Sequence, residues 1–158
     1  MPVDIALIAL LQENLHLRRQ IATDALTGVG SRHAHQTRAV DNWQSYIIVD
    51  VNNFKQINDT HGHPVGDAIL AAITGLIRDE TDHVFRTGGD EFAVVLNASF
   101  EAANVIADRI KNAIASKPIH GIECSISVGV GATATAADAA MYHQKINGPS
   151  TEPTHVHQ

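Results

Sequence analysis

The stretch from Arg86 to Phe92 constrains the fold of this chain more than any other. It reads Arg-Thr-Gly-Gly-Asp-Glu-Phe and joins two β-like stretches, residues 83–86 and 92–96. A Gly-Gly pair in this position predicts a tight β-hairpin, because both glycines can adopt positive φ. Asp90 and Glu91 follow the turn directly. Two carboxylates beside bare backbone suit Mg²⁺ and phosphate, although a solvated acidic turn is the simpler interpretation of this motif taken alone.

A second carboxylate ends another predicted strand. Residues 46–49, Tyr-Ile-Ile-Val, are typical of a strand buried on both faces, and Asp50 and a polar turn follow them. If this strand lies beside the hairpin, Asp50 and Asp90 can share cations. The polar segment 58–67, interpreted as a loop, offers an amide at Asn58 and a carboxylate at Asp67. A guanine base presents N1–H and N2–H₂ donors that such groups can accept.

The predicted elements indicate an α+β fold. Strands at about 46–49, 83–86, 92–96 and 124–130 alternate with helices at about 64–79, 100–115 and 136–145, and a further helix from about 32 to 40 precedes them. The order β-α-β-β-α-β suggests a ferredoxin-like, palm-type antiparallel sheet with helices covering one face.

Four motifs together resemble the GGDEF family of diguanylate cyclases. They are Asp-Ala-Leu-Thr-Gly-Val-Gly-Ser-Arg at 24–32, the segment 50–67, the hairpin 86–92 and Tyr-His-Gln-Lys-Ile-Asn-Gly-Pro at 142–149. Their order and spacing follow the family pattern from Asp24 to Gly148. The resemblance implies a diguanylate cyclase, a nucleotidyltransferase that condenses two GTP into cyclic diguanylate and releases two pyrophosphates, active as a homodimer.

The resemblance also implies a role for each motif residue. The expected metal ligands are Asp50, the main-chain carbonyl of Val51, Asp90 and Glu91, around two Mg²⁺ ions per site, with Mn²⁺ as an alternative. The expected catalytic residues are Asp90, Glu91 and Lys145. The expected substrate contacts are Asn53, Phe54, Asn58, Asp67, Arg86, Gly88, Gly89 and Lys145. Within this set the amides at Asn53 and Phe54 hold phosphate, Asn58 and Asp67 recognise guanine, and Arg86 steadies the acidic turn or the phosphates.

The chain departs from the family pattern at several positions. Pro149 stands where the family has an arginine, Asn52 replaces the second acid of the D-x-D motif, and Ser31 replaces an asparagine. Asp79 stands where many relatives have the arginine of an R-x-x-D product-inhibition site, so that site is expected to be absent. Loss of the arginine at 149 leaves a second hypothesis open: a weak or inactive domain that serves as a GTP-binding or protein-interaction module. A cyclase for another dinucleotide is less favoured, because Asp67 suits guanine rather than adenine.

Composition limits the partners. The 158 residues carry a formal charge of −6, and the 11 Lys and Arg form no basic stripe, so we expect no binding to nucleic acid or membrane. The lone Cys124 and the absence of a long apolar span predict a cytoplasmic protein. Three His-x-His pairs, at 33 and 35, 61 and 63, and 155 and 157, are weak evidence for zinc without further ligands.

Three regions are expected along the chain. Residues 1–22 predict a helix with an apolar heptad seam, a candidate dimerisation stalk, although packing on its own domain is an equal alternative. The seam consists of Leu7, Leu10, Asn14, Leu17 and Ile21. Residues 23–148 form the expected GGDEF domain, and residues 149–158 a disordered tail.

Overall fold

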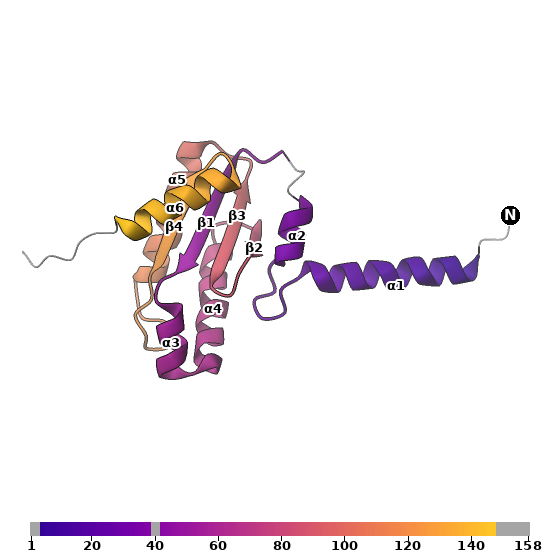
Figure 1. The fold of residues 1–158 in the computed structure, drawn as a ribbon, viewed down its shortest axis with the longest axis horizontal. Coiled ribbons are helices and arrows are strands. Elements are labelled where there is room, and N and C mark those ends of the chain that lie inside the picture. Colours follow the sequence, from indigo (N-terminus) through magenta and orange to yellow (C-terminus); the bar gives the residue numbers. More distant parts are fainter. Residues whose placement is uncertain (1–3, 39–41, 148–158) are drawn as a thin grey trace, which may run out of the picture.

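The computed structural model describes residues 4–38 and 42–147, and the expected tail lies outside this range. Figure 1 shows the elements. In chain order they are α1 (Ile5–Ala22), α2 (Arg32–Thr37), β1 (Ser45–Val51), α3 (Phe54–His61), α4 (His63–Arg78), β2 (Val84–Arg86), β3 (Glu91–Leu96), α5 (Phe100–Ala115), β4 (Ile126–Gly131) and α6 (Ala134–Ile146).

The four strands form one antiparallel sheet in the order β2-β3-β1-β4. This is the strand order of a ferredoxin-like sheet, so the predicted α+β palm-type fold is confirmed. Strand β1 lies inside the sheet, and its apolar residues are buried on both faces as predicted: Ile47 and Val49 are 0% exposed and Ile48 is 6% exposed. Asp50 pairs with Glu91 on β3 and with Ser127 on β4.

The main core lies between one face of the sheet and helices α4 and α5. Both helices carry apolar residues at helical spacing, and the side chains that face the sheet, such as Ile73 and Ile110, are 0% exposed. They pack against Val49 and Phe92 in a single cluster. Helix α5 spans the predicted residues, because its apolar period and the capping serine at position 99 mark it clearly.

The prediction that helices cover only one face is wrong, because α6 covers the opposite face. Figure 1 shows α6 lying across the sheet. Ala137 and Met141 of α6 pack there against Ile48 and Ala93. Close approach is allowed by Gly129 of β4, where a Cβ atom would lie 1.9 Å from the main-chain oxygen of Ala137. The sequence predicted this helix, but it did not indicate that a glycine of β4 makes room for it.

The hairpin has a different turn from the predicted one. Strands β2 and β3 are joined through Thr87–Asp90, and neither Gly88 nor Gly89 has positive φ. The turn closes because the amides of Thr87 and Gly88 donate to the carbonyl of Glu91, at 2.9 and 3.3 Å. This longer loop makes mirror-image turn conformations unnecessary.

The segment predicted as a loop at 58–67 is mostly helical. Helix α3 continues to His61, and α4 begins at His63. Gly62, with φ of 90°, separates the two helices in a conformation that favours glycine. Asn58 therefore lies on α3 and Asp67 on α4. Helix α2 ends at Thr37, earlier than expected, and residues 39–41 lie outside the described range.

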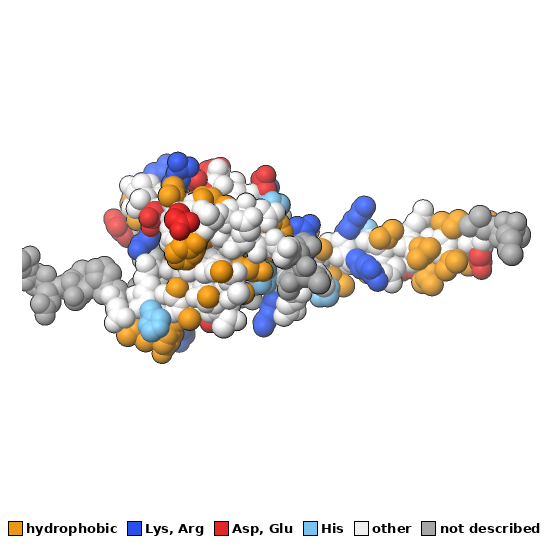
Figure 2. Space-filling view, turned by 90° about the horizontal axis from the view of Figure 1, so that it is seen from above, with side chains coloured by type: hydrophobic (Ala, Val, Ile, Leu, Met, Phe, Trp, Pro, Cys, Tyr) orange, Lys and Arg blue, Asp and Glu red, His pale blue; other side chains and the backbone are white. Residues whose placement is uncertain are grey.

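Helix α1 extends away from the body of the protein (Figure 1), and none of its residues is buried. Its apolar side chains are visible along the helix in Figure 2. The exposed ones are Ile5, Leu7, Ile8, Leu10, Leu11, Leu15, Leu17 and Ile21. Among the described helices, none combines the length and apolar character that crossing a bilayer requires.

Candidate active site

A pocket of about 660 Å³ opens where β1 ends and β4 begins. It gathers six of the predicted site residues: Asp50, Val51, Asn53, Phe54, Asp90 and Lys145. The remaining lining residues are Asn52, Lys55, Lys111, Ser125, Ile126, Ser127 and Gln144. Motifs far apart in the sequence therefore meet at one end of the sheet.

Asp50 forms the charged centre of this pocket. Its Oδ1 lies 2.9 Å from Nζ of Lys145, which α6 brings across the sheet. Burial raises the pKa of Asp50 above its ordinary value, and the charge of Asp90 adds to this rise, whereas the hydrogen bond and charge of Lys145 oppose it. Additional positive charge at this carboxylate would therefore favour its ionised form.

Asp90 is held beside Asp50 by the main chain and by Arg86. The carbonyl of Asp90 accepts a hydrogen bond of 3.0 Å from the amide of Val51. The Arg86 guanidinium donates to the carbonyl of Gly89 at 2.7 Å and lies 3.3 Å from the carboxylate of Asp24. These contacts match the turn-steadying role expected for Arg86, and its binding of phosphate stays a prediction.

Asp24 ties the first motif to the hairpin. Its carboxylate accepts hydrogen bonds from the amide and the hydroxyl of Thr27, at 2.9 and 2.6 Å. Burial alone would raise the pKa of Asp24, but the bonds from Thr27 and the charge of Arg86 outweigh it and hold the pKa below the ordinary 3.8. The first motif therefore stabilises the acidic turn through the contact between Asp24 and Arg86.

The start of α3 presents main-chain amides to the pocket. Asn53 precedes the helix with φ of 55°, and its side chain makes no capping hydrogen bond. The first amides of a helix have no acceptor within the helix, and the helix dipole adds positive potential there. The amides of Phe54 and Lys55 are thus suited to phosphate oxygens.

Asn58 and Asp67 lie on α3 and α4, outside this pocket. The side-chain oxygen of Asn58 is buried and has no hydrogen-bond partner. It packs against Gly66, where a Cβ atom would lie 1.8 Å from that oxygen. Asp67 is exposed. The buried amide oxygen is an acceptor without a donor, which is uncommon in folded proteins.

Glu91 shares a sheet face with Asp50 but lines a separate groove. Its carboxylate accepts a hydrogen bond of 2.8 Å from the hydroxyl of Thr87. The groove also contains Arg32 and His35 of α2 and Asp138 of α6. Burial lowers the pKa of His35 below its ordinary 6.5, against the opposing charge of Glu91. Gly88 and Gly89 line a further hollow beside Asp24.

A family model described as "Diguanylate cyclase, GGDEF domain" matches residues 21–150. The chain belongs to the GGDEF family of diguanylate cyclases. It is 35% identical over 151 residues to diguanylate cyclase DgcS of Shewanella oneidensis, an alignment that covers 82% of this chain and 51% of that protein. The chain spans about half the length of the curated relatives it matches.

Solved structures show the same GGDEF fold. Diguanylate cyclase SiaD of Pseudomonas aeruginosa, in complex with its activator SiaC, matches with a TM-score of 0.71 and 29% identity over 89% of this chain and 65% of that one. The coiled coil and GGDEF domain of DgcB from Caulobacter crescentus, in complex with c-di-GMP, matches with a TM-score of 0.77 over 90% and 91% of the two chains, at 24% identity.

Several residues of this GGDEF pocket were given no site role by the sequence analysis, which named Asn52 only as a departure from the D-x-D motif. Asn52 accepts a hydrogen bond of 2.6 Å from Ser127 and donates one of 3.0 Å to Ser125. Gln144 accepts a bond of 2.7 Å from the amide of Val128 and so covers the edge of β4. The alternation of Ser125, just before β4, with Ser127 in β4 was a signal for one shared face, whereas Lys111 gave no such signal.

The pocket around Asp50 contains oxygen donors that fit a divalent metal ion. Within the described residues no group of three or more His, Cys, Asp or Glu side chains converges on a point. Asp50 and Asp90 line one pocket with the main chain of Val51. Magnesium is commonly held by one or two carboxylates together with substrate phosphates, and this donor set agrees with that pattern.

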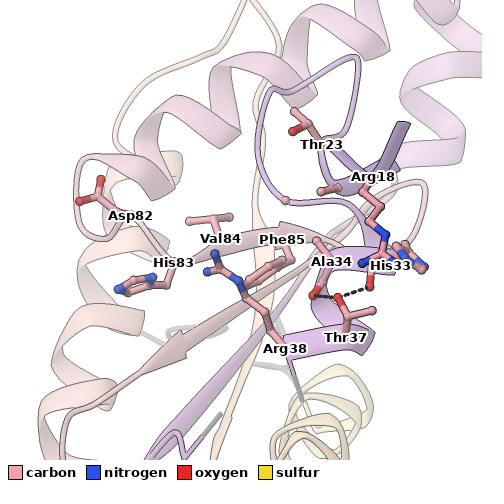
Figure 3. Close-up of a pocket in the computed structure, with 12 residues that line it drawn as sticks. Arg18, Thr23, His33, Ala34, Thr37, Arg38, Asp82, His83, Val84 and Phe85 are labelled. Carbon is pink, nitrogen blue, oxygen red and sulfur yellow. Dashed lines mark hydrogen bonds between the residues drawn. The ribbon is translucent and has the colours of Figure 1, made fainter. Parts of the chain in front are cut away.

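A larger hollow, of about 790 Å³, lies away from these carboxylates (Figure 3). Its lining residues include Arg18 of α1, His33 of α2, Arg38 just after α2, and Asp82 and His83 before β2. Asp82 is the acid of the R-x-x-D pattern, and Asp79 ends α4 in place of the arginine. Carboxylates and helix-start amides occur together in the pocket around Asp50, so that pocket is the candidate active site.

Proposed function

We propose that this GGDEF domain is a diguanylate cyclase, which condenses two GTP into cyclic diguanylate and releases two pyrophosphates. One observation carries the proposal: Asp50, Asp90, Lys145 and the start of α3 line a single pocket. Carboxylates for a divalent ion, amides for phosphates and a cation for the remaining charge are the parts that phosphoryl-transfer sites share.

Different residues of the pocket would bind the metal ion and the phosphates. Asp50, Asp90 and the carbonyl of Val51 would hold Mg²⁺, which when bound neutralises the triphosphate and lowers the pKa of a coordinated hydroxyl. Lys145 contacts Asp50 at 2.9 Å, and it can turn its charge to a phosphate once Asp50 has another partner. The amides of α3 hold phosphate oxygens without a change of shape, since the helix is already formed.

Asn58 and Asp67 would recognise the guanine. The Asn58 oxygen has no donor, so the amide sacrifices no hydrogen bond through this atom when it turns toward a ligand. A guanine edge offers N1–H and N2–H₂ to such acceptors, whereas adenine presents an acceptor at N1. This is the physical basis for proposing GTP over ATP.

Asp50→Asn and Asp90→Asn test the reaction. Each variant keeps the shape of the side chain and removes a negative charge from the pocket, so we expect product formation with GTP and Mg²⁺ to be lost while the circular dichroism melting curve stays close to the wild-type curve. Chromatography of the products gives the readout. Wild-type rates in both variants would contradict the site, and wild-type protein that binds GTP without converting it would support the binding-module alternative.

We further propose that the active form is a homodimer joined through α1. Its leucines are exposed along the whole helix, including Leu10 at 61% and Leu17 at 48%. A helix this apolar is stabilised when a second copy covers it, with Asn14 setting the register. Pairing would keep two GTP-loaded domains at a high effective concentration, on the order of millimolar for a short linkage.

Leu10→Glu together with Leu17→Glu tests the homodimer in the full chain. We expect GTP binding to stay unchanged and specific activity to fall as the protein is diluted, because the two half-sites separate. Gln12→Glu adds a charge to the same helix outside the seam and serves as the control. Full specific activity of the double variant at high dilution would show that α1 is not the dimer contact. The cytoplasmic location and the weak product feedback expected from Asp79 stay predictions.

A further inference from the structure

The active-site pocket contains three lysines from three different helices. Lys55 lies in the first turn of α3, Lys111 on α5 and Lys145 near the end of α6. The first and last belong to the motifs that define the family, whereas Lys111 belongs to none. The acidic residues of the pocket are Asp50 and Asp90. The pocket lining is therefore net positive, in a protein whose formal charge is −6.

The main chain at Lys111 is held in place by the packing of α5, and among the described residues Lys111 has no carboxylate partner. Its neighbours Ile110 and Ile114 are both 0% exposed, so the core holds this part of α5 against the sheet. The Lys111 side chain is half-buried, and none of the ion pairs between described residues includes it. The stem of a lysine can lie along the protein surface while its ammonium group stays free to pair with an anion. A bound anion would supply the charge partner that Lys111 lacks among the described residues.

One of the cations that the family pattern offers to the phosphate groups of a nucleotide is replaced in this chain. The family pattern has an arginine at position 149, and here that residue is Pro149, which has no charge and no side-chain donor. Lys145, near the end of α6, already contacts Asp50. One phosphate contact is therefore missing from the expected set, and Lys111 reaches the same pocket from the α5 side.

We propose that Lys111 binds a phosphate oxygen of GTP and replaces the cationic contact that Pro149 cannot make. This inference rests on the proposed function, because it assumes that GTP occupies the pocket around Asp50. An ammonium group acts on phosphate as a compact point charge, so it can substitute for an arginine in charge without reproducing its two-pronged geometry.

The test compares Lys111→Ala with Lys117→Ala in the full chain. Lys117 is exposed just beyond the end of α5 and does not line the pocket, so its variant controls for the loss of one positive charge. We expect Lys111→Ala to weaken GTP binding about ten- to a hundredfold, the effect of losing one hydrogen bond to a charged group. Binding of guanosine, which has no phosphate, stays unchanged. Lys117→Ala binds both ligands like the wild-type protein.

Two further variants separate a phosphate contact from a structural role. Lys111→Arg keeps the charge, and we expect it to retain most of the GTP affinity. Pro149→Arg restores the arginine of the family pattern, so if Lys111 takes over its contact, the change should raise the GTP affinity of Lys111→Ala more than that of the wild-type protein. Equal effects in both backgrounds, or an Lys111→Ala variant with wild-type GTP affinity, would overturn the inference. A wild-type protein that fails to bind GTP at all would instead overturn the proposed function.

Discussion

The close approach of α6 to Gly129 on β4 leads to a specific prediction for Gly129→Ala. A Cβ atom at this position would lie 1.9 Å from the main-chain oxygen of Ala137 and 2.3 Å from the main-chain nitrogen of Met141. Ordinary contacts begin at 3.4 Å, so α6 has to retreat by about 1.5 Å. Backbone cannot move aside as a flexible side chain can.

The cost follows from the packing that is lost. Overpacking of a well-packed core typically costs about 1–3 kcal/mol, and we expect the upper end because the obstructing atoms are main chain. A loss of about 3 kcal/mol corresponds to a fall in melting temperature of roughly 6–12 °C for a domain of this size. Movement of α6 away from the sheet would also weaken the hydrogen bond of 2.7 Å between Gln144 and Val128 and the contact between Lys145 and Asp50.

Urea unfolding measures the loss, with fluorescence from Trp43, the single tryptophan of the chain. Gly75→Ala is the matched control, because a Cβ atom there meets nothing within 4 Å and alanine favours the helix, so it should stabilise the protein by about 0.5–1 kcal/mol. GTP binding, measured where both variants are folded, should weaken only in Gly129→Ala. If Gly129→Ala unfolds within about 0.5 kcal/mol of the wild-type value, the packing argument fails.

Three further predictions concern ionisation and the guanine contact. Asp24→Asn should lower the free energy of unfolding by about 1–3 kcal/mol at neutral pH. Because the pKa of Asp24 is lowered in the folded state, the difference in free energy of unfolding between this variant and the wild-type protein should shrink as the pH falls below 3.8. A difference that stays constant with pH would contradict this linkage. His35→Gln should remove part of the stability loss of the wild-type protein below pH 6.5, because burial lowers the pKa of His35 and the unfolded chain then binds more protons; unchanged pH dependence in parallel melts would refute it. Gly66→Ala should weaken binding of GTP but leave the fold intact, since its Cβ displaces the Asn58 amide, and equal GTP affinity in titrations of the two proteins would show that this amide does not contact the base.

Local sequence signals were sufficient for the strands and the long helices. The short, β-branched apolar run around Ile47 favours a strand buried on both faces, and the spacing of Ile106, Ile110 and Ile114 favours a helix. Both signals come from burial, which dominates the energy of these elements. The prediction that Asp50 and Asp90 share cations depended on a further condition, that the strand of Asp50 lies beside the hairpin, and the pairing of β1 with β3 meets that condition.

The missed features depend on contacts that no local pattern encodes. Helix α3 is short and polar, with only Ile57 buried, so it has little apolar period to detect. The side of the sheet that α6 covers is set by Gly129 and Gly131, which look like ordinary strand-weakening glycines in the sequence. Lys111 reaches the pocket only because α5 packs where it does. In each case the feature depends on how two elements pack together, which the sequence of either element alone does not show.

The register of β1 connects the fold to the proposed chemistry. Asp50 points to the same face as its partners Glu91 and Ser127, while Val49 and Val51 on either side of it point into the core and are 0% and 1% exposed. A slip of one residue would bury the carboxylate and expose both valines, because side chains alternate along a strand. Burial of the valines therefore fixes the position of Asp50 beside Lys145. The apolar core selects the register, and the register places the carboxylate at the pocket where a metal ion and phosphates would meet.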